Sequence, residues 1–233
     1  MLRLILPTDL KLFTAKNVIW KPCIIKNMNT KKRTKKLISI LKKLYPDAKI
    51  ELKFENNMQL LAAVILSAQC TDKCVNMVTE TLFKKYKTPE DFAKANAKAF
   101  EWEIRSTGFY HNKACNIIGA AKMIVSKFWG KVPDNMEDLI TLPGVARKTA
   151  NVVLWTAFGK NEGVAIDTHA MRLSQQLGLT KGRTPEKIEK DLMNLVPRHL
   201  WGWFSLALVL AGRYICPARV KCSLEILEAA QKK

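Results

Sequence analysis

Apolar residues along most of the chain recur at the three- and four-residue spacing that marks one face of a helix, and no strand-like alternation of useful length occurs. Residues 58–66 are apolar on nearly every side, which is typical of a helix buried all round. The pattern predicts helices over residues 31–44, 58–66, 72–86, 89–95, 100–104, 113–128, 135–141, 146–158, 169–177, 185–195 and 200–211. The sequence therefore predicts an all-α fold.

The turn before the predicted helix over residues 146–158 carries an unusual charge pattern. Pro143 and Gly144 form a turn signal, and Arg147 and Lys148 follow at the start of the helix. Unpaired backbone N–H groups at a helix N-terminus suit a phosphate, and acidic residues are the usual choice in the first turn. Two cations in that place favour a nucleic-acid backbone as the partner. The alternative is a surface turn with basic neighbours.

The charge of the whole chain points the same way. Its 233 residues include 39 Lys and Arg against 20 Asp and Glu, a formal net charge of +19, and 48% of them are hydrophobic. This composition is typical of a globular protein whose partner is polyanionic. Residues 1–36 are strongly basic, with Asp9 as their one acid, yet the rest of the chain is basic too. Nucleic acid is favoured over a membrane, because no apolar run approaches the ~20 residues of a membrane span.

The cysteines and the N-terminus bear on the cellular compartment rather than on the partner. The six cysteines, at positions 23, 70, 74, 115, 216 and 222, lack the dense pairing of a secreted disulfide scaffold, which favours a reducing compartment. Residues 1–27 are basic and poor in acids, but they are rich in Lys rather than Arg and nearly lack Ser. A disordered DNA-binding arm, or a start at Met28, is therefore favoured over an organelle transit peptide.

Several short motifs follow one another in a recognisable order. They read LSAQCTDKCVN at 66–76, GFYHNKACNI at 108–117, LPGVARKTAN at 142–151, DTH at 167–169 and AGRYIC at 211–216. Together they resemble the helix-hairpin-helix DNA glycosylases, and most closely the endonuclease III family, whose signature is the hairpin with the downstream DTH. Matches in order over most of a chain are far more specific than any one of them.

The resemblance implies two helical domains with DNA bound across the cleft between them. The first would be a contiguous six-helix barrel over about residues 50–162, which includes the helix-hairpin-helix. The second would combine residues 28–49 with residues 163–233. Lys148 and Asp167 would flank the mouth of the cleft.

The resemblance also implies the catalytic residues. An amine that attacks C1′ of the sugar forms a Schiff base, which then permits elimination of the 3′-phosphate, and a neutral lysine is suited to this. Lys148 would be this nucleophile, and Asp167 would stabilise the positive charge that develops on the sugar. A phosphate contact at Lys148 and a helix N-cap at Asp167 are the structural alternatives. The pair implies a bifunctional DNA glycosylase and AP lyase.

The hairpin would hold a DNA phosphate. The resemblance gives this role to the backbone of Gly144, Val145 and Ala146, with Arg147 beside it. The usual second glycine of the family is here Ala146. If that position requires a positive φ, alanine costs about 1 kcal/mol.

Three further side chains would contact DNA. Gln69 and Phe109 would enter the duplex when the target base is extruded, and the bulky Phe109 could stack on a neighbouring base. A polar residue at a helix end and a loop aromatic packed on the core are the alternatives. His169 is expected to be a structural hydrogen-bonding residue at the DNA rather than a catalyst.

The chain departs from the family at its C-terminal end. Endonuclease III typically carries four cysteines with the spacing C-x6-C-x2-C-x5-C, which bind a [4Fe–4S] cluster. Here only Cys216 and Cys222 are present, with five residues between them. A cubane cluster requires four thiolates. We therefore expect no cluster and no metal, and we expect apolar packing by Leu224, Ile226 and Leu227 in its place.

The sequence thus predicts a base-excision-repair enzyme that removes oxidised pyrimidines from double-stranded DNA and cleaves the abasic site by β-elimination. The alternatives are a non-catalytic DNA-binding protein and a glycosylase for a different lesion or mismatch. We expect a monomer without membrane contact. Its location would be the cytoplasm, with the nucleoid, in a prokaryote, and the nucleus or mitochondria in a eukaryote.

Overall fold

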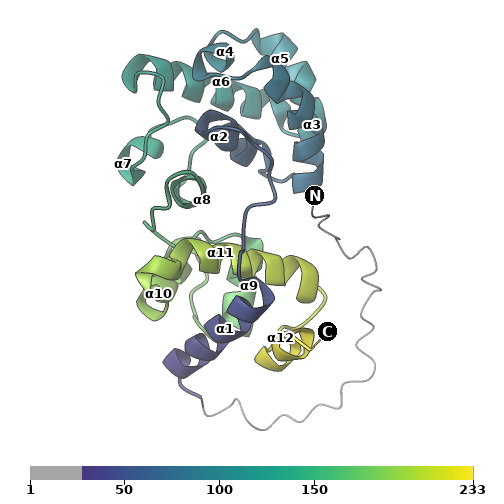
Figure 1. Cartoon of the computed structure of the whole chain (residues 1–233), viewed down its shortest axis with the longest axis vertical. Helices are drawn as coiled ribbons and strands as arrows, with labels where there is room; N and C mark the ends of the chain where they lie inside the picture. The colour runs from purple at the N-terminus through teal and green to yellow at the C-terminus, as the bar shows by residue number, and fades with distance from the viewer. Residues whose placement is uncertain (1–27, 233) are drawn as a thin grey trace, which may run out of the picture.

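The computed structural model describes residues 28–232, and all regular structure in that range is helical, as predicted (Figure 1). The first half contains α1 (Thr30–Leu44), α2 (Asn57–Leu66), α3 (Asp72–Lys85), α4 (Pro89–Ala93), α5 (Ala97–Ile104), η2 (Arg105–Thr107) and α6 (Tyr110–Lys127). The second half contains α7 (Met136–Leu139), α8 (Arg147–Phe158), α9 (Thr168–Gln176), α10 (Pro185–Leu195), η3 (Arg198–Leu200), α11 (Trp201–Leu210), η4 (Ala211–Ile215) and α12 (Leu224–Ala230). No helix in this part of the chain is long and apolar enough to cross a membrane.

The first of two hydrophobic cores is built around α2. Every residue from Met58 to Leu66 is buried, as the apolar run predicts, and α2 packs against α3, α6 and α8. Four aromatic rings contact one another in this core, those of Phe83, Tyr86, Phe92 and Phe100. The core takes its buried residues from the continuous stretch between Leu52 and Leu154.

The second core joins the two ends of the described chain. It combines α1 with α9, α10, α11 and α12, which lie below the first unit in Figure 1. Trp203 of α11 donates from Nε1 to the carbonyl oxygen of Tyr45 at 2.9 Å. Leu224 and Leu227 of α12 are 1% and 0% exposed, and Ile226 packs beside them. The predicted apolar packing at the C-terminal end is therefore present.

Short polar side chains fix the start of most described helices. An oxygen of the residue before the helix accepts a backbone N–H of the first turn, which satisfies one of the donors that a helix leaves unpaired there. This cap is made by Asn29, Asn56, Thr71, Thr88, Asn96, Asn135, Asp167, Thr184 and Ser223. Helix α8 is different, because Ala146 precedes it and provides no side-chain cap.

Some predicted helix boundaries are wrong. Helix α6 begins at Tyr110 instead of residue 113, because Phe109 takes a left-handed backbone conformation and the helix starts directly after it. Helix α7, predicted over residues 135–141, is a single turn, because the chain already bends toward the hairpin at Ile140. Helix α4 ends two residues before the predicted position 95. The predicted arm over residues 1–27 lies outside the described residues.

Candidate active site

A cavity of about 90 Å³ lies where the two cores meet. Lys148 and Asn151 of α8 line it on the side of the first core, and Asp167 and Ser205 line it on the side of the second core. The structure therefore brings the two predicted catalytic side chains to one cavity. Small-molecule sites are usually about 300–1,000 Å³. An extruded base would have to widen this cavity or bind at its rim.

Lys148 is an exposed residue in the first turn of α8. Its ammonium group forms no hydrogen bond and no ion pair with any residue in the range 28–232. The first N–H groups of α8 also lack a side-chain cap, because Ala146 has no side-chain acceptor. A phosphate or another anionic group can therefore approach this helix end without displacing a protein contact.

Arg147, next to Lys148, is held by α10. Its Nε donates to Oε2 of Glu189 at 2.9 Å, and Nδ2 of Asn151 donates to Oε1 of the same carboxylate at 2.9 Å. Glu189 is 7% exposed, and a Cβ at Gly163 would lie 2.0 Å from its Oε1. The buried carboxylate thus fixes the first turns of α8. Arg147 offers only the rest of its guanidinium group to DNA.

Asp167 caps α9, and its Oδ1 accepts the backbone N–H of Ala170 at 2.7 Å. The structural alternative considered for this residue is therefore present. Its Oδ2 has no hydrogen-bond partner within the described chain. Asp167 is half-buried and lines the cavity that Lys148 also lines. One oxygen can stabilise a cation in the cavity while the other caps the helix.

The hairpin turn needs only one glycine. Gly144 has a φ of +76°, and a Cβ there would lie 2.8 Å from Cβ of Asn116 on α6. Ala146 has a φ of −86° in the extended region. The expected cost of alanine is therefore absent. Val145 is buried, and its N–H donates to the carbonyl oxygen of Leu142 at 3.1 Å.

Gln69 and Phe109 lie at the exposed tips of two loops. Gln69 has a φ of 53° and Phe109 a φ of 50°. Phe109 is 65% exposed, so it is not the core-packed loop aromatic of the alternative reading. Gln69 is also exposed. Gly108 marks a turn before Phe109, but Gln69 follows the end of α2 without a glycine or proline, so its left-handed conformation could not be inferred from the sequence.

Lys113 connects the two loops, and the sequence analysis gave it no role. Its Nζ donates to the carbonyl oxygen of Leu66, at the end of α2, at 2.7 Å. It also donates to the carbonyl oxygen of Thr107, just before the Phe109 loop, at 2.8 Å. Lys113 is 4% exposed, and burial lowers its pKa. One buried ammonium group thus ties the loop of Gln69 to that of Phe109.

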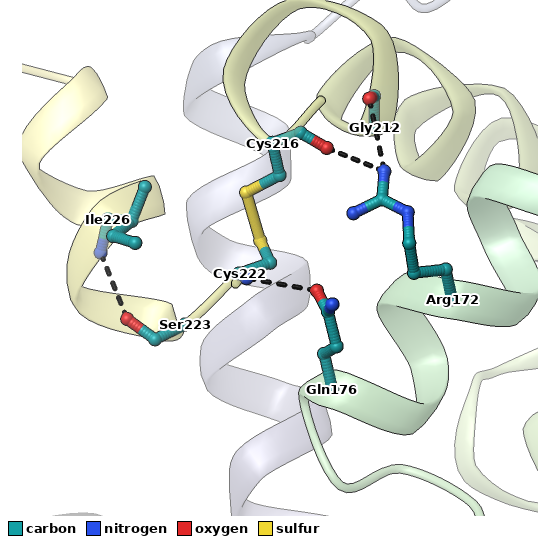
Figure 2. Close-up of a disulfide and its surroundings, with 7 residues drawn as sticks. All are labelled: Arg172, Gln176, Gly212, Cys216, Cys222, Ser223 and Ile226. Carbon is teal, nitrogen blue, oxygen red and sulfur yellow. Dashed lines mark hydrogen bonds between the residues drawn. A yellow bond between two sulfur atoms is a disulfide. The ribbon is translucent and has the colours of Figure 1, made fainter. Parts of the chain in front are cut away.

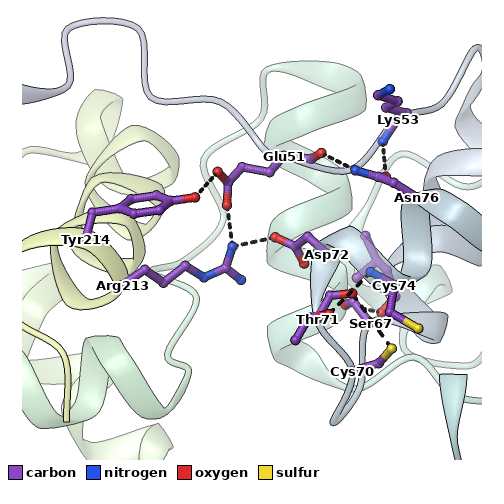
Figure 3. Close-up of polar contacts among 11 residues, drawn as sticks. Glu51, Lys53, Ser67, Cys70, Thr71, Asp72, Cys74, Asn76, Arg213 and Tyr214 are labelled. Carbon is purple, nitrogen blue, oxygen red and sulfur yellow. Dashed lines mark hydrogen bonds and ion pairs between the residues drawn. The ribbon is translucent and has the colours of Figure 1, made fainter. Parts of the chain in front are cut away.

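A polar network crosses the junction beside the cavity (Figure 3). Arg213, in the π-helical segment η4, pairs with Glu51 and with Asp72 of α3. The hydroxyl of Tyr214 donates to the other oxygen of Glu51. Burial, with added repulsion from Tyr214 and Glu51, raises the pKa of Tyr45 to about 12. The network links the second core to Glu51, in the segment between α1 and α2, and to α3, the helix that follows the Gln69 loop.

The C-terminal loop is closed by a disulfide between Cys216 and Cys222, whose Cα atoms are 5.5 Å apart (Figure 2). Nη2 of Arg172 donates to the carbonyl oxygen of Cys216 at 2.6 Å, and Oε1 of Gln176 accepts the N–H of Cys222 at 2.9 Å. Both partners are on α9, the helix that Asp167 caps. The cysteine count favoured a reducing compartment and did not predict this disulfide.

His169 faces the same C-terminal segment. A Cβ at Gly212, in η4, would lie 2.7 Å from Cβ of His169 and 2.9 Å from its Nδ1. The close approach allows α9 to pack against η4. This position agrees with a structural role, and the predicted DNA contact of His169 stays a prediction.

The described residues do not fit the cluster of the family. Both sulfur atoms at the matching position are joined in the Cys216–Cys222 disulfide. The free cysteines of the described range are Cys70, Cys74 and Cys115, which lie on the other core. No group of three or more His, Cys, Asp or Glu side chains between residues 28 and 232 is arranged to hold a metal ion.

Comparisons with known proteins agree with the geometry. Residues 62–198 match the family model described as HhH-GPD superfamily base excision DNA repair protein. The chain is 52% identical to endonuclease III of Synechocystis sp. over 197 residues, which is 84% of this chain and 90% of the relative. A structure of a trapped endonuclease III–DNA covalent intermediate aligns with a TM-score of 0.79 at 42% identity, covering 82% of this chain and 90% of that one. A non-covalent endonuclease III–DNA complex aligns with a TM-score of 0.81 at 40% identity, over 88% and 100%.

Proposed function

The chain belongs to the endonuclease III family of the HhH-GPD superfamily of base excision DNA repair proteins, and on that premise we propose how its own residues act on damaged double-stranded DNA. It is a base-excision DNA glycosylase with AP lyase activity. We assign it oxidised pyrimidines as substrates, Lys148 as the nucleophile and Asp167 as the carboxylate that assists it.

The observation that carries this proposal is the shared cavity of Lys148 and Asp167. Lys148 is exposed and has no ion pair in the described chain. An amine must be neutral to attack. The approach of DNA would remove water from the cavity and disfavour the charged ammonium.

The reaction follows from this placement. Nζ of Lys148 attacks C1′ of the sugar, the N-glycosidic bond breaks, and the base leaves with a proton. The nitrogen lone pair then expels the ring oxygen, which takes up a proton from solvent, and the protonated Schiff base results. Removal of a proton from C2′ then expels the 3′-phosphate, which is the β-elimination step. Oδ2 of Asp167 stabilises the positive charge on the sugar during base departure.

The remaining predicted residues would hold the DNA. The uncapped start of α8, after Gly144, Val145 and Ala146, is suited to a phosphate. Arg147 would contribute the guanidinium nitrogens that Glu189 does not engage.

Gln69 and Phe109 would fill the space of the extruded base, because their exposed side chains stand on two loops fixed relative to each other by Lys113. His169 would lie beside the DNA as part of the packing of α9.

We also propose that the chain acts without a [4Fe–4S] cluster. The support is the donor set, because Cys216 and Cys222 are two thiols where the family motif has four. Iron and acid-labile sulfide measured on anaerobically purified protein would test it. Four iron atoms per chain would contradict the proposal.

The two hydrophobic cores support a two-domain organisation close to the predicted one, with residues 50–162 in the first domain and residues 28–49 and 163–233 in the second. The monomeric state and the cellular location stay predictions.

The test is borohydride trapping on a duplex that contains one oxidised pyrimidine. Lys148→Ala and Lys148→Arg are the variants. The arginine keeps the positive charge for a phosphate contact but cannot form a Schiff base. We expect a covalent adduct with the native chain and none with either variant, while Lys148→Arg retains duplex affinity.

Each other outcome has a definite meaning. An adduct that survives in Lys148→Arg would show that another amine is the nucleophile. Base release without an adduct in the native chain would indicate a monofunctional glycosylase. Tight duplex binding without base release on a panel of oxidised, deaminated and mismatched duplexes would indicate a non-catalytic DNA-binding protein.

A further inference from the structure

Two thiols lie in and directly after the loop that carries Gln69. We call residues 67–71 and 105–109 the insertion loops. Cys70 directly follows Gln69 in the first of them, and Cys74 lies in the first turn of α3. Both side chains are partly exposed, and the two sulfur atoms lie next to each other in Figure 3. Burial, and then the neighbouring Cys74 thiol, raises the pKa of Cys70.

The two thiols contact both insertion loops. Sγ of Cys74 donates to the carbonyl oxygen of Ser106 in the second loop at 3.4 Å. In the first loop, the N–H of Cys70 donates to the carbonyl oxygen of Ser67 at 3.1 Å, and its Sγ donates to that of Thr71 at 3.7 Å. Cys70 and Cys74 therefore hold the backbone between Gln69 and α3 through these hydrogen bonds, and their side chains contact each other.

A cation stands beside the pair. The buried ammonium group of Lys113 donates to the carbonyl oxygens of Leu66, just before the first insertion loop, and of Thr107, in the second. It also interacts electrostatically with the sulfur atoms of Cys70 and Cys74. This positive charge opposes the burial that raises the pKa of Cys70, and so favours the thiolate that attacks an oxidant. The pair is thus accessible, close and next to a fixed cation.

We propose that Cys70 and Cys74 are an oxidation site that closes to a disulfide and thereby withdraws Gln69 from DNA. The oxidant is a hydroperoxide. One thiolate attacks the peroxide oxygen, which gives a sulfenic acid and releases an alcohol or water. The second thiol then attacks the sulfenic sulfur, and water leaves as the S–S bond forms. The two thiols supply the two electrons that reduce the O–O bond, and an added dithiol reverses the step.

The structural consequence follows from disulfide geometry. A disulfide fixes its Cα atoms about 5.5–6 Å apart and its torsion near 90°, and the proposal requires that this constraint changes the backbone from Cys70 to Cys74. Gln69, one residue earlier and already left-handed, turns with it. Cys74 also loses the hydrogen that it donates to Ser106. The part of the proposal that concerns Gln69 rests on the proposed function.

The experiment has two separate measurements on the full-length chain. The protein is treated with hydrogen peroxide, alkylated and digested, and the Cys70–Cys74 linkage is sought by mass spectrometry. Base excision from a duplex with one oxidised pyrimidine is then measured in single turnover. We expect the linkage to form and excision to fall by at least about tenfold, since small misplacements near a reacting group cost this much or more. Dithiothreitol should remove the linkage and restore excision.

Matched variants separate the causes. Cys74→Ser keeps a hydroxyl that can donate to Ser106, cannot form the disulfide, and should excise at the native rate before and after peroxide. Cys115→Ser removes an exposed cysteine of the same core and should leave the peroxide response intact. Thermal unfolding of both variants checks that each is folded, and Cys70→Ser replaces Cys74→Ser if the latter is not.

The outcomes that overturn the inference differ from those that overturn the proposed function. Alkylation of both Cys70 and Cys74 after peroxide treatment would exclude the oxidation site. A disulfide without a change in excision would exclude the effect on Gln69. Loss of the response in Cys115→Ser would move the site to that thiol. A reduced native chain that excises no base would contradict the proposed function, while the linkage measurement would still decide the oxidation site.

Discussion

Gln69 and Phe109 lie 40 positions apart, on different loops, and both hold the left-handed backbone conformation, with φ values of 53° and 50°. This conformation costs a residue with a side chain roughly 1–2 kcal/mol. Neither residue recovers that cost by burial, because both side chains are exposed. Exposed strain of this kind clusters at functional sites. Trp129 shares the conformation at φ 50°, but it directly follows the C-cap residue of α6, where this conformation is common, and the N–H of Gly130 after it donates to the carbonyl oxygen of Ile124 at 3.1 Å.

Phe109→Gly should separate strain from function. Glycine takes a positive φ without steric cost, but it raises the conformational entropy of the unfolded chain, which offsets part of the gain. We therefore expect the free energy of unfolding to stay level or rise by up to about 1 kcal/mol. Single-turnover base excision should fall by about 10–100-fold, because the inserting side chain is gone. Phe109→Ala should lose the same activity without gaining stability. An equal loss of stability in both variants would show that the ring packs on the fold.

Asp167→Asn should separate catalysis from helix capping. Asparagine caps a helix as well as aspartate, and the acceptor for the N–H of Ala170 is kept. We expect the free energy of unfolding to change by less than about 0.5 kcal/mol and base excision to fall by about 100-fold or more. Asp167→Ala should lose the activity and about 1 kcal/mol of stability as well. Native excision by the asparagine variant would leave Asp167 with the cap alone.

Lys113→Met should loosen both insertion loops. It leaves two buried carbonyl oxygens, those of Leu66 and Thr107, without their donor, so we expect a loss of about 2–4 kcal/mol in the free energy of unfolding. Excision should fall further than the loss of folded protein explains. Retained native stability would show that water replaces the ammonium group.

The same variant gives a pH test. Burial lowers the pKa of Lys113 below 10.5, so the unfolded chain keeps this proton at pH values where the folded chain has lost it. The contribution of Lys113 to stability therefore rises as pH increases toward 10.5 and is lost as pH falls through the folded pKa. Denaturant unfolding of the native chain and Lys113→Met over this range should show their difference growing with pH. A constant difference would contradict the lowered pKa.

Duplex affinity should depend steeply on salt. The net charge of +19 predicts binding dominated by phosphates, with a log–log slope near −0.9 for each phosphate neutralised. Fluorescence anisotropy on an undamaged duplex measures it, and a flat response would contradict this interface.

Deletion of residues 1–27 should weaken this non-specific binding while single-turnover cleavage is kept. Loss of cleavage would show that this segment belongs to the fold.

The sequence predicted those features that depend on neighbours along the chain. The all-helical fold and the buried α2 follow from spacing, and Asp167 caps the helix that its position suggests. The bonds of Lys113 could not be predicted in this way, because its acceptor at Leu66 is 47 positions away. The hold of Glu189 on Arg147 spans 42 positions. Local patterns carry no information on such pairs.

Two local features depend on their surroundings in the same way. The conditional cost of alanine at position 146 does not arise, because the observed φ of Ala146 is −86°. The cysteine count favoured a reducing compartment, whereas Cys216 and Cys222 form a disulfide in a short loop that Arg172 and Gln176 bind. In both cases the three-dimensional context decided.

The division of the second core between the two ends of the chain has a consequence for biosynthesis. Trp203 bonds to Tyr45 across 158 positions, and at about 5–20 residues per second a ribosome needs about 8–30 s to make that stretch. Helix α1 leaves the ribosome early, with the apolar side chains of Leu37 and Leu41 uncovered until α11 and α12 follow. The α2–α8 core, by contrast, is continuous and can close while translation is still under way. The nascent chain would thus carry a folded first core while α1 still lacks its packing partners. During that time the apolar face of α1 is a surface that chaperones can bind.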